Sequence, residues 1–139
     1  MHRTLAVTAI VFGSVLVVLA TSNREYGANE YDTVVRGTSP DGRYEIATHG
    51  EGYLGYDNFH LYLVDHKARN SLITLNEPVE PFVDTGADAY YADWSPDSKQ
   101  VSITFRAERH VAVKVTYRIR DGRPIQVGGR HRVRGLPPD

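Results

Sequence analysis

The segment Trp94-Ser95-Pro96-Asp97-Ser98-Lys99, followed by the alternating segment Gln100-Val101-Ser102-Ile103-Thr104-Phe105, decides the fold of this chain. A close counterpart, Thr38-Ser39-Pro40-Asp41-Gly42-Arg43, occurs earlier and also precedes an alternating segment, Tyr44 to Thr48. Proline sets its own φ for a tight turn, and aspartate hydrogen-bonds to nearby backbone amides. Each Ser-Pro-Asp segment therefore predicts a turn between two β-strands.

The clearest predicted strand of the chain is His110–Arg120. Apolar and polar residues alternate along it, which is typical of a strand with one face in a core and the other in water. Asp121-Gly122 follows as a strong hairpin signal, and Pro124–Val127 returns as an edge strand, where a leading proline is tolerated. The residues expected in the core are Val111, Val113, Val115, Tyr117 and Ile119.

Strands are predicted throughout the chain after residue 20, because no window there has the i, i+3, i+4 and i+7 apolar spacing of a helix. The sequence predicts an all-β fold of about eight antiparallel strands in two four-stranded meanders, preceded by a signal or anchor helix. We expect the meanders to pack as a small sandwich or open barrel. The remaining predicted strands are Thr33–Gly37, Arg43–Thr48, Phe59–Asp65, Leu72–Leu75, Ala89–Trp94 and Gln100–Arg106.

The two Ser-Pro-Asp segments and their meanders resemble the blade motif of TolB-type β-propellers, in which a strand ends in Trp-Ser-Pro-Asp-Gly-Lys. The first repeat departs from the motif at Thr38, where tryptophan is usual, and the second at Ser98, where glycine is usual. The resemblance covers most of Thr33 to Val127 and implies a protein-binding scaffold without catalytic residues. A propeller closes with four to eight blades, so two repeats are too few for a ring unless several chains complete one.

The N-terminus has the pattern of a secretory signal peptide. Leu5–Ala20 is mainly apolar after a short positive opening, and Ala20 is the small residue expected before a cleavage site. The alternative is an uncleaved membrane anchor, slightly shorter than the roughly 17 to 25 residues that span a bilayer. Either places the folded part outside the cytoplasm, as a periplasmic or secreted domain. The predicted segments are a signal or anchor (1–20), a polar tether (21–32), the all-β domain (33–128) and a flexible basic tail (129–139).

Composition excludes several classes of protein. The chain has no cysteine, so it has neither disulfides nor the lipidated cysteine of a lipoprotein. Its net charge is −1, but acids outnumber Lys and Arg 14 to 5 over Glu25–Phe105, and Lys and Arg outnumber acids 9 to 3 over Arg106–Asp139. Either these charges are simply solvated, or the arginine tail attracts anions of the cell envelope. Nucleic-acid binding is not expected for an exported, slightly acidic chain.

Catalytic motifs are weak in this sequence. His49, Glu51, Asp57 and His60 lie in or beside a glycine-rich segment, and imidazole with carboxylate groups can bind zinc or transfer protons. Their spacing matches no standard metal motif, and the serines of the Ser-Pro-Asp segments are better explained as turn formers. We therefore expect no enzyme, no cofactor and no metal. The alternative is a metal-dependent or acid-base hydrolase that uses His49, Glu51 and His60.

The expected function is recognition of a protein or another component of the cell envelope through loops on the β scaffold. Tyrosine, tryptophan and arginine dominate binding hot spots, and loops on a rigid sheet often carry binding. A membrane contact is expected only through an uncleaved N-terminal segment, and association between chains stays open. The candidate binding residues are Tyr53, Tyr56, Asp57, His60, Tyr90, Tyr91, Arg130 and Arg132.

Overall fold

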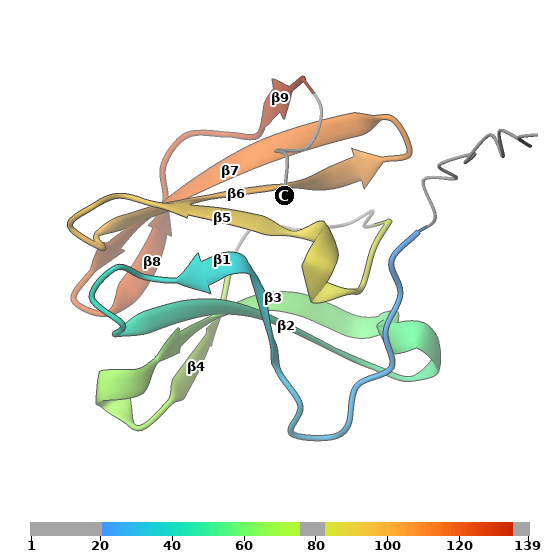
Figure 1. The fold of residues 1–139 in the computed structure, drawn as a ribbon, viewed down its shortest axis with the longest axis horizontal. Coiled ribbons are helices and arrows are strands. Elements are labelled where there is room, and N and C mark those ends of the chain that lie inside the picture. The colour runs from blue at the N-terminus through green and yellow to red at the C-terminus, as the bar shows by residue number, and fades with distance from the viewer. Residues whose placement is uncertain (1–20, 76–82, 135–139) are drawn as a thin grey trace, which may run out of the picture.

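The computed structural model describes residues 21–75 and 83–134, so the predicted signal or anchor segment (1–20) lies outside the described residues. Within the described ranges, no helix is both long and apolar enough to cross a bilayer. Apart from short 3-10 turns, the regular structure there is all strand (Figure 1). The strands are β1 (Asp32–Thr38), β2 (Tyr44–Glu51), β3 (Asp57–Asp65), β4 (Ser71–Thr74), β5 (Tyr91–Trp94), β6 (Gln100–Glu108), β7 (Val111–Arg120), β8 (Arg123–Gln126) and β9 (His131–Val133).

The strands form one nine-stranded sheet that curls into a nearly closed barrel (Figure 1). β1 to β4 form one antiparallel meander, and β5 to β8 form the second. The meanders join through β1 and β5, which run parallel and pair at Val35 and Tyr91. The prediction of an all-β fold with two four-stranded meanders in an open barrel is therefore confirmed.

The two Ser-Pro-Asp turns have the same hydrogen-bond network. Ser39 Oγ donates to Asp41 Oδ1 (2.7 Å) and accepts from the Tyr44 amide (3.0 Å), and the same Asp41 oxygen accepts from the Arg43 amide (3.0 Å). The β5–β6 turn repeats these contacts at 2.6, 3.0 and 3.1 Å. The serine hydroxyl, and then the backbone amide, hold the pKa of Asp41 and Asp97 below the ordinary value.

The two turns also contact each other. The Asp41 amide donates to Ser98 Oγ (3.0 Å), and Trp94 Nε1 donates to Gly37 O (3.0 Å) nearby. Ser98 occupies the position that Gly42 has in the first repeat, and both residues have positive φ, at 59° and 74°. A β-carbon is disfavoured in this conformation. Serine therefore replaces glycine at a conformational cost, and its hydroxyl joins the two turns.

The two repeats bury opposite faces of equivalent strands. Tyr44 and Ile46 of β2 belong to the core, but their equivalents in β6, Gln100 and Ser102, are not part of it. β6 instead buries Val101 and the alternate residues that follow it. Because side chains alternate along a strand, a shift of one residue exchanges its two faces. The face that the first meander turns to the core is therefore equivalent to the face that the second meander turns away from it.

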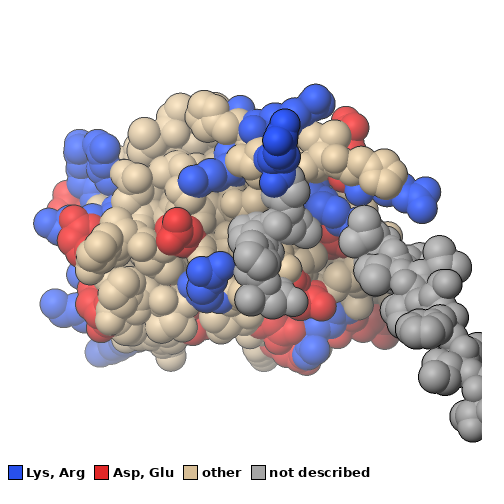
Figure 2. Space-filling model, turned by 45° about the horizontal axis from the view of Figure 1, so that its top comes forward, with Lys and Arg blue, Asp and Glu red and all other residues tan. Residues whose placement is uncertain are grey.

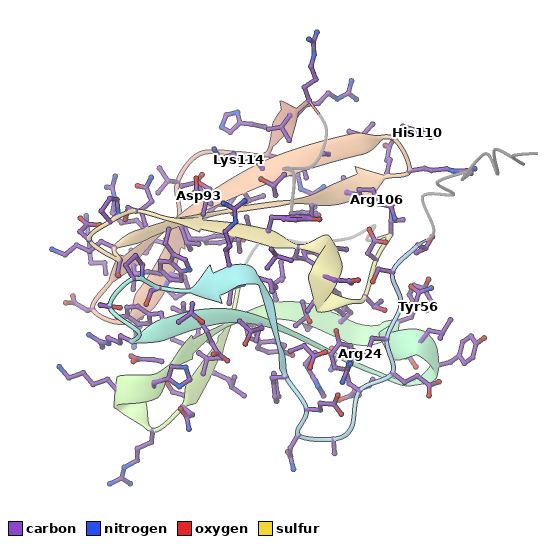
Figure 3. The ribbon with its side chains drawn as sticks, in the orientation of Figure 1. Arg24, Tyr56, Asp93, Arg106, His110 and Lys114 are labelled. Carbon is purple, nitrogen blue, oxygen red and sulfur yellow. The ribbon has the colours of Figure 1, made fainter. Side chains whose placement is uncertain are left out.

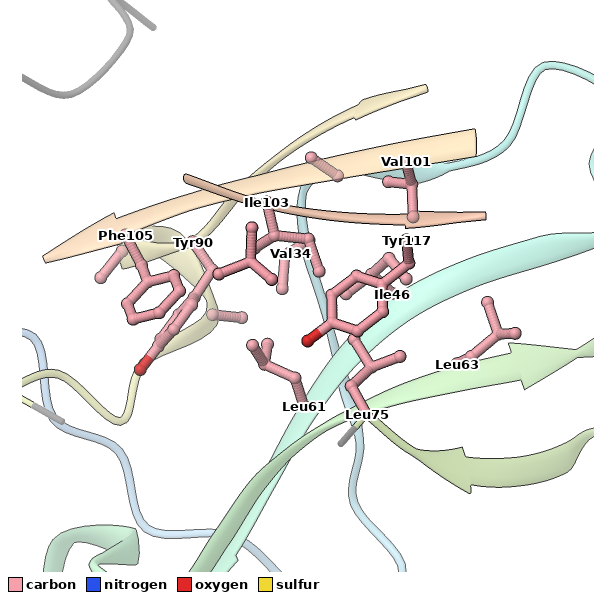
Figure 4. Packing of buried hydrophobic residues seen from close by; sticks show 14 of the residues in the cluster. Val34, Ile46, Leu61, Leu63, Leu75, Tyr90, Val101, Ile103, Phe105 and Tyr117 are labelled. Carbon is pink, nitrogen blue, oxygen red and sulfur yellow. The ribbon is translucent and has the colours of Figure 1, made fainter. Parts of the chain in front are cut away.

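The core fills the space between the meanders (Figure 4). The ring of Tyr90 lies 5.8 Å from that of Phe59 and 5.5 Å from that of Phe105, so aromatic contacts connect β3 with β6. Each large apolar side chain that is fully buried contributes roughly 1.5–3 kcal/mol. Other members with almost no exposed surface are Ile46, Leu63, Val101, Ile103, Val115 and Tyr117.

Residues 21–31, called the strap below, lack helix and strand but are tied to the barrel. The Ser22 amide donates to Asp84 Oδ1 (2.8 Å), and the Arg24 amide donates to Thr85 Oγ1 (3.0 Å). At the end of the strap, the ring of Tyr31 stacks on His49 at 4.5 Å. The segment expected as a polar tether therefore covers part of the outer face of the first meander.

Part of the segment expected as a flexible tail (129–139) is a strand, and residues 135–139 lie outside the described residues. β9 pairs with β7, and His131 lies opposite Lys114. β8 pairs only with Tyr117–Arg120 of the ten-residue β7, which leaves the beginning of β7 without a partner on that side. Exposed backbone groups at such an edge favour the addition of another strand. β9 provides that strand at Ala112–Lys114.

Candidate functional site

The connections between strands gather at two ends of the barrel. The turn end carries the two Ser-Pro-Asp turns and the β3–β4 and β7–β8 turns. The strap end carries the strap, the β2–β3 connection, residues 83–90 and the β6–β7 connection. Figure 3 shows Tyr56, Arg106 and His110, from three different segments, at this second end. The strap end is where half of the predicted binding residues meet.

Residues Gly52–Asn58, called the tyrosine loop below, form the most exposed aromatic feature of the described chain. Tyr53 is 76% exposed and Tyr56 is 40% exposed. Asp57 is also exposed, and His60 is half-buried on β3, with its Nε2 3.2 Å from Asn58 Oδ1. The structure thus brings together four of the predicted binding residues: Tyr53, Tyr56, Asp57 and His60.

Glycines fix the conformation of the tyrosine loop. Gly52 has φ 68° and ψ −162°, a region that residues with a β-carbon rarely adopt. A β-carbon at Gly50 would lie 2.1 Å from Gly55 O, which leaves no room for a side chain. The glycine-rich sequence therefore specifies one tight loop rather than a loose connection.

The tyrosine loop is also fixed to its neighbours. The Tyr56 hydroxyl donates to Asn23 Oδ1 (3.0 Å), and the Leu54 amide donates to Glu25 Oε1 (3.5 Å). On the other side, Thr85 Oγ1 donates to Leu54 O (2.6 Å). The exposed ring of Tyr53 therefore projects from a base that two separate segments, the strap and residues 83–90, hold in place.

The histidines predicted for a hydrolase lie next to each other, but one is covered. His49 and His60 are directly opposite on β2 and β3, and Glu51 pairs with Asp57 beyond them. His49 is only 6% exposed beneath Tyr31, and its Nδ1 lies 2.6 Å from Glu30 O. Zinc needs three or four converging ligands. Among residues 21–75 and 83–134, no group of three or more His, Asp or Glu residues is placed to hold a metal.

Sequence reasoning missed a buried ion pair at the strap end. Arg106 Nε and Nη2 donate to Asp84 Oδ2 (2.9 Å) and Oδ1 (2.6 Å), and both side chains are buried. These hydrogen bonds raise the pKa of Arg106 still further. The Tyr90 hydroxyl donates to Asp84 O (2.6 Å), and burial raises the pKa of Tyr90. The only sequence signal for this ion pair is an arginine directly after the core residue Phe105. That signal does not identify Asp84 as the partner of Arg106.

The other predicted binding residues do not join the tyrosine loop. Tyr90 is 1% exposed in the core, so it has no surface to offer a partner. Tyr91 is half-buried on β5, and Arg132 is exposed on β9. The guanidinium carbon of Arg130 lies 5.7 Å from the centre of the Phe105 ring. The tyrosine loop is therefore a separate surface from the arginines.

The turn end contains a cavity that the sequence did not indicate. Its volume is about 630 Å³, and it lies between the second Ser-Pro-Asp turn and the end of β7. None of the predicted binding residues lines it. Its lining includes Asp97, Lys99, Gln100, Arg118, Arg120 and Asp121.

Comparison with known proteins gives no relative, because no family model, no curated protein and no solved structure matches this chain. The case for a function therefore rests on the tyrosine loop and the other residues described above.

Proposed function

We propose that this chain is an exported, non-catalytic binding protein that recognises a protein or another envelope component through the tyrosine loop. The observation that carries the proposal is Tyr53, which is 76% exposed on a loop with a fixed backbone. Exposed tyrosines on rigid supports make effective binding residues, because little conformational freedom is lost on binding. The resemblance to TolB-type blades also favours a binding role.

The geometry gives less support to the hydrolase alternative. Tyr31 covers His49, and the Nδ1 atom of His49 is engaged by a backbone carbonyl. A general base or metal ligand must reach its substrate or ion. The tyrosine loop, in contrast, offers its aromatic surface directly to solvent.

The test is capture of a partner from envelope extracts by the immobilised full chain. Tyr53→Ser should weaken capture by at least about 30-fold, which is the size of a binding hot spot. Tyr53 is the better choice for substitution, because the hydroxyl of Tyr56 also holds the strap.

The matched control is Leu72→Ser, which changes a residue that is 43% exposed on β4. This variant should capture the partner as well as the unchanged chain does. Equal capture by Tyr53→Ser and the unchanged chain would show that the tyrosine loop is not the binding surface.

A further inference from the structure

We propose that the cavity at the turn end is a second binding site, and that it binds phosphate or phosphodiester groups. This site is separate from the tyrosine loop at the opposite end of the barrel, and it goes beyond the proposed function. Three cationic side chains surround it: Lys99 from the second Ser-Pro-Asp turn, and Arg118 and Arg120 from β7.

The sheet register brings these cations together. Arg118 and Arg120 are alternate residues on β7, so they share one face and their α-carbons are about 7 Å apart. Gln100 lies opposite Arg118 on β6, where its amide group is a further hydrogen-bond donor. The Ile119 amide donates to Lys99 O (2.7 Å), which fixes the lysine beside β7.

The cations of the site form no ion pair within the described chain. Arg24, Arg43 and Arg106 each form an ion pair with a carboxylate. Among residues 21–75 and 83–134, no carboxylate lies within 4.0 Å of the charged nitrogens of the three cavity cations or of the neighbouring Arg123.

The acids beside the cavity are Asp97 and Asp121. Asp97 Oδ1 already accepts hydrogen bonds from Ser95 Oγ and from the Lys99 amide. The charge of Lys99 also acts on Asp97, but less than the hydrogen bonds from Ser95 and the Lys99 amide do. Neither Asp97 nor Asp121 forms an ion pair with a lysine or arginine of the described chain, so these cations keep their capacity to bind an external anion.

A pair of like charges also lies at this end of the barrel. Arg120 and Arg123 are directly opposite each other on β7 and β8. Like charges in this position destabilise a sheet, and an anion bound between or beside them removes the repulsion. Folding alone does not explain why two arginines occupy paired positions at an exposed edge.

The chemistry of the side chains suits a phosphate group. The planar guanidinium fork donates two parallel hydrogen bonds to a phosphate, which makes arginine the usual residue for its recognition. Lys114 continues the row on the same face of β7, with His131 opposite it. A row from Lys114 to Arg120 extends about 20 Å, which suits several phosphates in series.

The β9 side of the molecule also carries an excess of positive charge. Figure 2 brings the β9 side of the molecule forward, and Lys and Arg side chains outnumber Asp and Glu over the upper part of this face. In sequence, residues 109–134 contain eight Lys and Arg residues and one acid. A field of one sign attracts anionic ligands and accelerates their association.

The test measures binding of the full chain, in a neutral maltoside detergent, to fluorescein-labelled inorganic polyphosphate by anisotropy at several salt concentrations. A second arm measures co-sedimentation with phosphatidylcholine vesicles prepared with or without phosphatidylglycerol. Any apolar contact of residues 1–20 with lipid is common to both vesicle types, so the difference between them reports charge. Binding to polyphosphate identifies a free phosphate polymer as the source, and binding only to phosphatidylglycerol vesicles identifies a lipid headgroup.

The variant Arg118→Gln with Arg120→Gln should bind about 30-fold more weakly at low salt, if each arginine near a phosphate surface contributes about fivefold. The control is Arg109→Gln with Arg132→Gln, which removes the same charge from the strap end and from β9. All four side chains are exposed, so both variants should keep the unfolding midpoint of the unchanged chain.

Three results would overturn the proposal. The first is that the unchanged chain binds neither probe. The second is an equal loss in the two double variants, which would mean that only net charge matters. The third is a larger loss in the control, which would place the anion site at Arg132 and the C-terminal arginines instead.

Discussion

Replacing Ser98 by alanine should lower the free energy of unfolding by about 1 kcal/mol, whereas replacing it by glycine should leave stability nearly unchanged. Ser98 is 3% exposed, has φ 59°, and accepts a hydrogen bond from the Asp41 amide across the two turns. Alanine removes the acceptor but keeps the β-carbon in the unfavourable conformation. Glycine removes both the acceptor and the conformational cost.

The magnitudes come from two opposing effects. One intramolecular hydrogen bond contributes about 1 kcal/mol net, and Asp41 is near enough to solvent for water to replace part of the loss. A left-handed conformation costs a residue with a β-carbon roughly 1–2 kcal/mol, and glycine avoids this cost. Glycine also makes the unfolded chain more flexible, which offsets part of that gain in stability. The two effects nearly cancel in Ser98→Gly, and only the loss remains in Ser98→Ala.

The twin turn provides a matched control. Gly42 has φ 74°, and a β-carbon added there would have no neighbouring atom within 4 Å, so Gly42→Ala tests the conformational cost alone. It should destabilise the chain by about 1 kcal/mol. Gly42→Ser should cost the same amount, because no partner is within reach of the added hydroxyl.

Urea unfolding provides the assay, and the single tryptophan provides the signal. Trp94 stacks on Tyr44 at 6.1 Å beside the turns, so its fluorescence reports loss of this region. A change of about 1 kcal/mol moves the midpoint by about 0.3 to 1 M urea. If Ser98→Gly loses as much stability as Ser98→Ala, the conformational cost assigned to Ser98 is wrong. If neither loses any, the hydrogen bond between the turns does not contribute.

The ion pair, the core and the turns each give a further expected outcome. Asp84→Ala should destabilise the chain by roughly 3–5 kcal/mol in urea unfolding, because Arg106 remains as a buried charge without its partner. Leu63→Ala should cost roughly 2–5 kcal/mol, whereas Leu72→Ala on the exposed face should change the same free energy by less than about 0.5 kcal/mol. The lowered pKa of Asp97 means that its contribution to stability is complete above the ordinary aspartate pKa of about 3.9 and is lost as the pH falls through the lowered value. Asp97→Asn should therefore flatten the acid side of a stability-against-pH curve, and an unchanged curve would contradict the assignment.

Local pattern was enough to predict eight of the nine described strands and the turns between them, but not β9. The alternation from Val111 to Ile119 specifies β7, and its expected core residues are buried or half-buried on the inner side. The Ser-Pro-Asp segments contain every side chain of their turn networks, so the turns could be predicted without any distant contact. The all-β class follows from these local signals.

Contacts between distant segments could not be predicted in the same way. Tyr90 and Tyr91 are adjacent, so only one of them faces the core, and the sequence does not say which. The partner of Arg106 lies in a loop that shows no periodicity. The four predicted residues around the tyrosine loop were close in sequence, which is why the structure brings them together.

The two repeats bury opposite faces, and this arrangement decides which surfaces lie on the outside of each meander. When one face of a unit packs on the opposite face of the next unit, the contact is head-to-tail. Such contacts either close into a ring or continue indefinitely. Repeat proteins stop this growth with terminal units whose outer faces are polar. Here Tyr31 of the strap closes the free face of the first meander over His49, and Lys114 belongs to the polar free face of the second. The outer faces of the two described meanders therefore carry the covered and polar surfaces with which repeat proteins end their growth.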